Sequence, residues 1–138
     1  MKKRVSLVAP FYNESGNVLE FFRRIAAVAD SMPQYEFEVI AVNDGSRDQT
    51  WAELVEARAR FPGVHLVDLS RNFGKEAALT AGLDRAHGDA VVPIDSDLQH
   101  PPEVLEQMLA QWEQGAEVVL AQRTDRVTDG KLQKLSAT

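Results

Sequence analysis

The 138-residue sequence has no cysteine, which excludes a disulfide framework and a thiolate metal site and is compatible with a cytoplasmic setting. No stretch approaches the roughly 18 consecutive apolar residues of a membrane span. The apolar run after Arg4 breaks at Pro10, which is too short for the core of a signal peptide. A net charge of −6 without a basic stripe argues against nucleic acid as a partner. We therefore expect a soluble globular protein.

Short apolar runs alternate with longer segments in which apolar residues recur at helical spacing. The predicted strands are Val5–Ala9, Phe37–Val42, Val64–Leu69, Ala90–Ile94 and Glu117–Ala121. The helices between them include Lys75–Ala86, which Gly88 should end, and Pro102–Gln114. This alternation predicts an α/β fold, with a mostly parallel, Rossmann-like sheet. The strands look apolar on both faces, so helices should cover both sides.

The stretch 92–102, V-P-I-D-S-D-L-Q-H-P-P, is the most informative part of the chain. An apolar run ends there in Asp95 and Asp97, and Gln99 follows at the same spacing. Taken alone, two acids before Pro101 and Pro102 are equally suited to cap a helix. Their position after a buried strand favours a site for Mg²⁺ or Mn²⁺, with Asp97 and Gln99 as oxygen ligands. We interpret this stretch as a metal and diphosphate site for a nucleotide sugar, in which Asp95 would orient the sugar, the ribose or the metal shell.

Other polar residues also follow predicted strands, where ligands bind in open α/β sheets. Asp44 stands in N-D-G-S, which suits a plain turn but also places a carboxylate to accept the ring N–H of uracil or guanine. Pro10, Tyr12 and Glu14 either end a strand and start a helix or line a base and ribose pocket.

Three cations are candidates to lie near the proposed diphosphate: Arg71, Lys75 and Arg123. Each could equally be a solvated surface charge. Lys75 begins a predicted helix, where backbone N–H groups also favour anions. The three histidines lack metal-ligand spacing, and no Ser-His-Asp or Cys-His set is visible. The sequence therefore offers acids and cations, but no evident nucleophile with its base.

Five motifs in order carry a resemblance: P-F-Y-N-E, N-D-G-S-R-D-x-T, R-N-F-G-K-E-A-A, D-S-D-L-Q-H-P-P-E and Q-R. From Val5 to about Arg126 the chain resembles family 2 glycosyltransferases of the GT-A fold. It is most similar to the polyprenyl-phosphate type, which includes dolichol-phosphate mannose synthases and bactoprenol glucosyltransferases. The third motif leans toward the bacterial branch that uses UDP-sugars.

The resemblance implies roles for individual residues. The nucleotide-sugar positions are Pro10, Tyr12, Glu14, Val42, Asp44, Lys75, Asp95, Ser96 and Arg123, and the metal positions are Asp97 and Gln99. Catalytic roles fall on Asp95, Asp97 and Arg123. The resemblance also implies a nucleotide-sugar-binding domain over residues 1–126 and the truncated start of an acceptor-side segment over 127–138. Family members continue into membrane helices, so the full-length protein is expected at the cytoplasmic side of the cell membrane.

The implied reaction is the inverting transfer of a sugar from a nucleotide diphosphate sugar to a polyprenyl phosphate, undecaprenyl or dolichyl. A UDP-sugar is the favoured donor, and GDP-mannose is the other. A phosphate monoester already carries about −1.5 to −2 charges at pH 7, so it needs no general base as nucleophile. Two alternatives stay open: a family 2 transferase that acts on a sugar hydroxyl, and a fragment that binds nucleotide without turnover.

Overall fold

The computed structural model describes residues 2–97, 102–115, 118–121 and 132–135. They fall into two compact units, Met1–Asp97 and Leu98–Thr138. The predicted domain boundary between residues 126 and 127 lies outside the described residues and stays a prediction. None of the helices in the described part of the chain has the length and apolar character that crossing a membrane requires.

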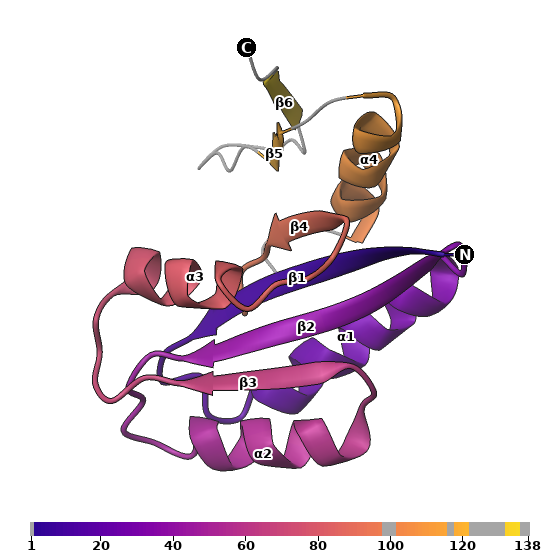
Figure 1. Ribbon diagram of the computed structural model, residues 1–138. Helices are drawn as coiled ribbons and strands as arrows, with labels where there is room; N and C mark the ends of the chain where they lie inside the picture. The colour runs from indigo at the N-terminus through magenta and orange to yellow at the C-terminus, as the bar shows by residue number, and fades with distance from the viewer. Residues whose placement is uncertain (1, 98–101, 116–117, 122–131, 136–138) are drawn as a thin grey trace. The chain divides into compact units, whose positions relative to one another are not determined.

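The first unit is built on a four-stranded sheet in which every strand runs parallel to its neighbours (Figure 1). Its strands lie in the order β3-β2-β1-β4. They are β1 (Lys3–Phe11), β2 (Tyr35–Asn43), β3 (Val64–Asp68) and β4 (Ala90–Pro93). The predicted parallel α/β sheet is confirmed. β1 and β2 start earlier than predicted. The sequence pattern misses their first residues because these are largely polar and exposed and do not extend the apolar runs.

Helices cover both faces of this sheet, as predicted. They are α1 (Val18–Ser31), α2 (Thr50–Arg60) and α3 (Lys75–Leu83). Successive side chains of a strand point to opposite faces. Phe11 of β1 therefore packs on one face, against Phe21 and Phe22 of α1 at ring-centroid distances of 5.2 and 6.3 Å. Val8 of β1 packs on the other face, under α3.

The helix α3 ends at Leu83, three residues before the predicted end, and Gly88 is not its cap. The C-cap residue is Asp84. Gly88 serves a different purpose, because a Cβ atom built on it would lie 2.6 Å from Ser6 Oγ. The glycine is thus required by a close approach of the chain to β1, which sequence spacing cannot distinguish from a helix stop.

The second unit contains α4 (Pro102–Glu113) and the strands β5 (Val118–Ala121) and β6 (Leu132–Leu135). The two strands pair antiparallel, from Val118 opposite Leu135 to Ala121 opposite Leu132. The sequence predicts β5 but not β6, and the alternating pattern suggests another parallel strand. The difference has a simple reason: only ten residues lie between β5 and β6, whereas a parallel pair needs a crossover of about a dozen residues or more.

Candidate functional site

The loops that follow β1 to β4 all start at one edge of the first unit's sheet, because the four strands are parallel (Figure 1). The first two loops begin side by side. The N–H of Asp44, just after β2, donates to the carbonyl of Phe11, the last residue of β1, at 2.9 Å. The polar residues that follow the strands of the first unit, which ends at Asp97, therefore share this edge.

The loop after β1 is bonded to the segment after β2. The N–H of Asn13 donates to Ser46 Oγ at 3.0 Å, and that of Glu14 donates to Thr50 Oγ1 at 2.8 Å. Asn13 has a φ of 52°, a left-handed conformation that asparagine tolerates. This arrangement leaves Tyr12 exposed and Glu14 half-buried at the edge. Their predicted contacts with a base and a ribose stay predictions.

Asp44 is only 2% exposed and organises the loop before α3. Its Oδ1 accepts the N–H of Phe73 at 2.8 Å, and its Oδ2 accepts the N–H of Gly74 and an amide hydrogen of Asn72, each at 3.1 Å. The loop also lies directly on Gly45, where a Cβ would meet the backbone carbon of Arg71 at 2.2 Å. The contact with a base that the sequence predicts for Asp44 must therefore share a carboxylate with these three bonds.

A carboxylate offers about four lone-pair positions to donors. Three hydrogen bonds already engage those of Asp44, so about one remains for a ring N–H. The structural role of Asp44 as a loop clamp is thus observed, and base recognition stays a prediction. The sequence does not reveal the donors, because Asn72, Phe73 and Gly74 lie about thirty positions away and two of them bond through the backbone.

An ion pair joins α3 to the loop after β4. Lys75, the first residue of α3, places Nζ 2.6 Å from Oδ1 of Asp95. Side-chain exposure is 64% for Lys75 and 20% for Asp95, so the pair sits at the surface of the edge. Since Lys75 directly follows Gly74, the bonds of Asp44 also place this cation. The structure therefore connects Asp44 to Asp95 through one short segment.

The remaining predicted residues have varied positions. Ser96 is half-buried and Asp97 is exposed in the turn after β4, and Pro10 is half-buried near the end of β1. The side chain of Val42 is fully buried beneath α3 and does not face the edge. Gln99 and Arg123 lie outside the described residues. Arg71 places its guanidinium 4.6 Å from the centre of the Phe73 ring.

Within the described ranges there is no group of three or more His, Asp or Glu side chains that could hold a metal by itself. The donors at the edge still fit Mg²⁺ or Mn²⁺. Asp95 and Asp97 provide hard oxygen ligands, and Mg²⁺ is usually bound by one or two carboxylates together with substrate phosphates and water. Asp97 is exposed in the turn after β4, and its predicted role as a metal ligand stays a prediction.

Comparison with solved structures defines the class of protein. A mannosyltransferase from Pyrobaculum calidifontis, solved with GDP-Man and Mn²⁺, has a TM-score of 0.73 at 24% identity over 86% of this chain and 35% of that chain. TarS from S. aureus, solved with UDP-GlcNAc, has a TM-score of 0.68 at 28% identity over 86% of this chain and 33% of that chain. The fold is that of the GT-A glycosyltransferases.

The sequence profile described as glycosyl transferase family 2 matches residues 6–137, and the chain belongs to that family. The bactoprenol glucosyl transferase of Shigella phage SfV is 44% identical over 134 residues. That match covers 97% of this chain and 43% of the relative, so the chain spans less than half of that relative's length.

Proposed function

We propose that this chain is the donor-binding part of a glycosyltransferase that transfers a sugar, with inversion, from a nucleotide diphosphate sugar to a polyprenyl phosphate. One observation carries the proposal. The bond of Asp44 to Gly74 and the ion pair of Lys75 with Asp95 hold two carboxylates and one ammonium group at the carboxyl edge of a family 2 sheet. The similarity to a bactoprenol glucosyl transferase supports a lipid-phosphate acceptor.

In this proposal the nucleotide lies along the loops after β1 and β2, near Tyr12, Glu14 and Asp44. Its diphosphate faces Lys75, which begins α3, where the amino-terminal end of the helix adds positive potential. Because the Lys75 ammonium is largely exposed, it can turn from Asp95 toward a phosphate without a change in the backbone. Arg123, which lies outside the described residues, is the other cation that the sequence predicts for the donor phosphates.

A bound Mg²⁺ or Mn²⁺, held by Asp97 with Gln99 as the predicted second ligand, would act as a Lewis acid that neutralises charge on the leaving diphosphate. Asp95 orients the sugar or the metal shell. The acceptor phosphate attacks the anomeric carbon from the opposite side and needs no general base, in accordance with the lack of an evident base in the sequence. A polyprenyl phosphate acceptor would put the reaction at the cytoplasmic side of a membrane.

A thermal-denaturation panel tests donor binding. UDP, GDP and their sugars are added to the 138-residue chain with and without Mn²⁺, and we expect a UDP compound to raise the melting temperature most. Saturation at about 100 times Kd corresponds to about 2.7 kcal/mol of added stability. Asp97→Ala should abolish the Mn²⁺-dependent part of the shift.

Asp84→Ala is the matched control, because Asp84 is an exposed aspartate at the other end of α3. It should leave the shift unchanged. If no nucleotide changes the melting temperature of the wild-type chain, the proposed donor site is wrong. If Asp97→Ala keeps the full dependence on Mn²⁺, the assignment of that ligand is wrong.

A further inference from the structure

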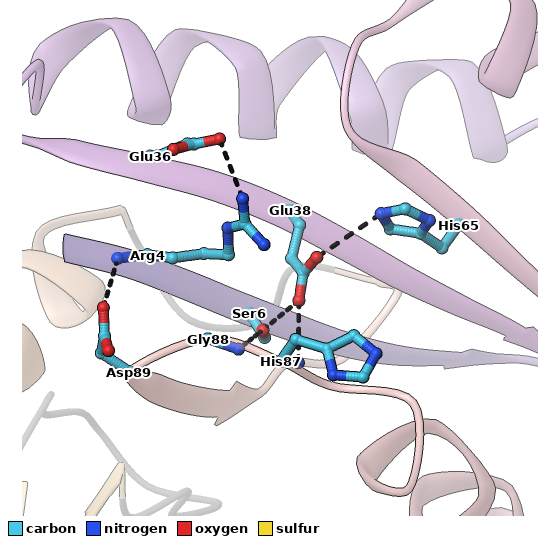
Figure 2. Close-up of polar contacts among 8 residues, drawn as sticks. All are labelled: Arg4, Ser6, Glu36, Glu38, His65, His87, Gly88 and Asp89. Atoms are coloured by element: carbon cyan, nitrogen blue, oxygen red, sulfur yellow. Dashed lines mark hydrogen bonds and ion pairs between the residues drawn. The ribbon is translucent and has the colours of Figure 1, made fainter. Parts of the chain in front are cut away.

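A second polar cluster lies in the amino-terminal halves of β1 and β2, away from the carboxyl edge that carries the candidate site; Figure 2 shows this cluster. Its centre is Glu38 of β2, beside Ser6 of β1 in the strand register. Glu38 is 6% exposed and Ser6 is fully buried, and the Ser6 hydroxyl donates to Glu38 Oε2. Burying a carboxylate is costly unless it is well paired. Two buried polar residues at neighbouring positions of the sheet therefore call for an explanation.

The free acceptor positions of this pair are used by the turn that precedes β4. The backbone N–H of His87 donates to Glu38 Oε2 at 3.1 Å, and that of Gly88 donates to Ser6 Oγ at 2.8 Å. Gly88 lies so close to Ser6 that a Cβ there would clash with the hydroxyl. Figure 2 shows both bonds converging from the turn onto the two strands.

The next residue of the turn continues the attachment. The N–H of Asp89 donates to the carbonyl of Arg4 at 2.7 Å, and the N–H of Arg4 donates to Asp89 Oδ2 at 2.9 Å. Three consecutive residues before β4 are thus bonded to β1 or β2. The turn is held at one position along the sheet before the strand begins.

β4 itself has few means of fixing its register. It is four residues long, and among the described strands it pairs only with β1. Val92 is its one buried residue, whereas Val91 is 40% exposed and Pro93 is exposed and has no N–H. Register is strongly specified only where a hydrophobic face is buried, and a short, mostly exposed strand is prone to slip.

A slip of β4 by two residues would move the loop after it by about 6.6 Å, at about 3.3 Å per residue. That loop carries Asp95 and Asp97. We propose that Glu38 and Ser6 form a register clamp: positioning residues that fix β4 against β1 and thereby place Asp95 and Asp97. The effect of the register clamp on the position of β4 does not depend on any ligand. Its effect on donor binding rests on the proposed function.

Amide hydrogen exchange, followed by NMR on the 138-residue chain, tests the clamp. The reporters are the N–H groups of Asp89 and Ile94, which bond to Arg4 and Val8 of β1 at 2.7 and 2.9 Å. The reference is the N–H of Leu69, which bonds to Asn43 at 3.0 Å on the other side of the sheet. In Glu38→Ala we expect both reporters to exchange about tenfold faster or more, with the reference unchanged.

Two variants sharpen the test. Glu38→Gln keeps one oxygen that can accept from Ser6 and His87, and it should restore slow exchange at the reporters. Glu36→Ala removes an exposed glutamate of the same strand, which Figure 2 shows paired with the side chain of Arg4, and should leave exchange unchanged. Should Glu38→Ala fail to fold, Ser6→Ala replaces it, because it removes the acceptor for Gly88 and little volume.

Unchanged exchange at Asp89 and Ile94 in a folded clamp variant would overturn the proposal. Equal acceleration at the reference would overturn it too, because loss of a residue that merely stabilises the whole fold speeds exchange at every amide. UDP titration with Mn²⁺ is run in parallel, and a clamp variant should bind about tenfold more weakly or worse. If the wild-type chain binds no nucleotide, the proposed function fails, while the exchange data still decide the clamp.

Discussion

Individual side chains at the carboxyl edge have more than one task. Asp44 holds the loop of Asn72 to Gly74 through three hydrogen bonds and stands where a nucleobase is expected. A carboxylate suits both tasks because it accepts hydrogen bonds and donates none. An amide of the same shape would turn a donor toward one of its present partners.

Asp44→Asn therefore tests how much the hydrogen bonds of Asp44 to this loop stabilise the protein. One oxygen remains for Phe73, but the new NH₂ group faces the N–H of Gly74, and a buried donor is left unpaired. We expect the free energy of unfolding to fall by about 1–3 kcal/mol in urea denaturation. Asp30→Asn, at an exposed position of α1, should change it by less than about 0.5 kcal/mol. Equal stability of the two variants would contradict the structural role of the Asp44 hydrogen bonds.

Glu38 shows how a buried acid is kept charged. Burial alone raises its pKa, but the hydrogen bonds from the Ser6 hydroxyl and the His87 backbone, with the charges of His65 and Arg4, lower the pKa below its ordinary value of 4.5. His65 Nε2 lies 3.4 Å from Glu38 Oε1. Since the folded form of Glu38 binds a proton less readily than the unfolded form, its stabilising effect is present above pH 4.5 and is lost on acidification below it.

Acid denaturation should reveal this contribution. The free energy of unfolding of the wild-type chain should decrease between about pH 5 and about pH 3, and Glu38→Gln should show a shallower decrease, since it cannot take up the proton. Chemical denaturation at a series of pH values measures both slopes. Asp48, whose pKa is also lowered, titrates in both proteins and leaves a common background. Parallel curves for the two proteins would refute the assignment to Glu38.

Among the elements, α3 is the one that ties the core to the edge. Its first residue, Lys75, pairs with Asp95, while Ala78 and Gly82 face the sheet. Gly82 allows the helix to approach so closely that a Cβ there would lie 2.4 Å from Cγ1 of Val8 and 3.0 Å from Cγ2 of Val42. The depth of this contact sets where Lys75 emerges at the edge.

Gly82→Ala is expected to destabilise the protein although alanine favours helix by about 1 kcal/mol over glycine. The added methyl overlaps stiff β-branched side chains, and overpacking a core costs about 1–3 kcal/mol. The urea midpoint should therefore fall, whereas Thr80→Ala, at an exposed position of the same helix, should change little. A rise in the midpoint of Gly82→Ala would mean that α3 packs less closely than the structure indicates.

On the scale of the whole first unit, the parallel sheet separates two tasks. The loops at the carboxyl ends carry the acids and the cation of the candidate site, and the buried polar cluster in the amino-terminal halves of β1 and β2 bonds to the turn before β4. A parallel sheet brings all its carboxyl ends to one edge, so a site can be assembled from segments distant in sequence. The same geometry lets a change at the amino end of β4 act on Asp95 and Asp97.

The elements of the first unit could be read from the sequence because they depend on local pattern. Apolar runs, helical spacing and Gly-rich turns lie within about ten residues of one another, and the strand-helix alternation implies a parallel sheet. The grouping of Tyr12, Asp44, Lys75 and Asp95 at one edge follows from that topology alone. The five ordered motifs also indicated family 2, which the profile over residues 6–137 confirms.

Only the tertiary structure decided which of these groups touch. Lys75 meets Asp95 across 20 positions, Ser6 meets Glu38 across 32, and Gly88 meets Ser6 across 82. The predicted strands look apolar on both faces although they contain Ser6 and Glu38, because the pairing of these two residues depends on strand register, and the role of Gly88 depends on a close backbone approach. Such contacts arise from packing between distant segments, and no local pattern encodes the distance between them.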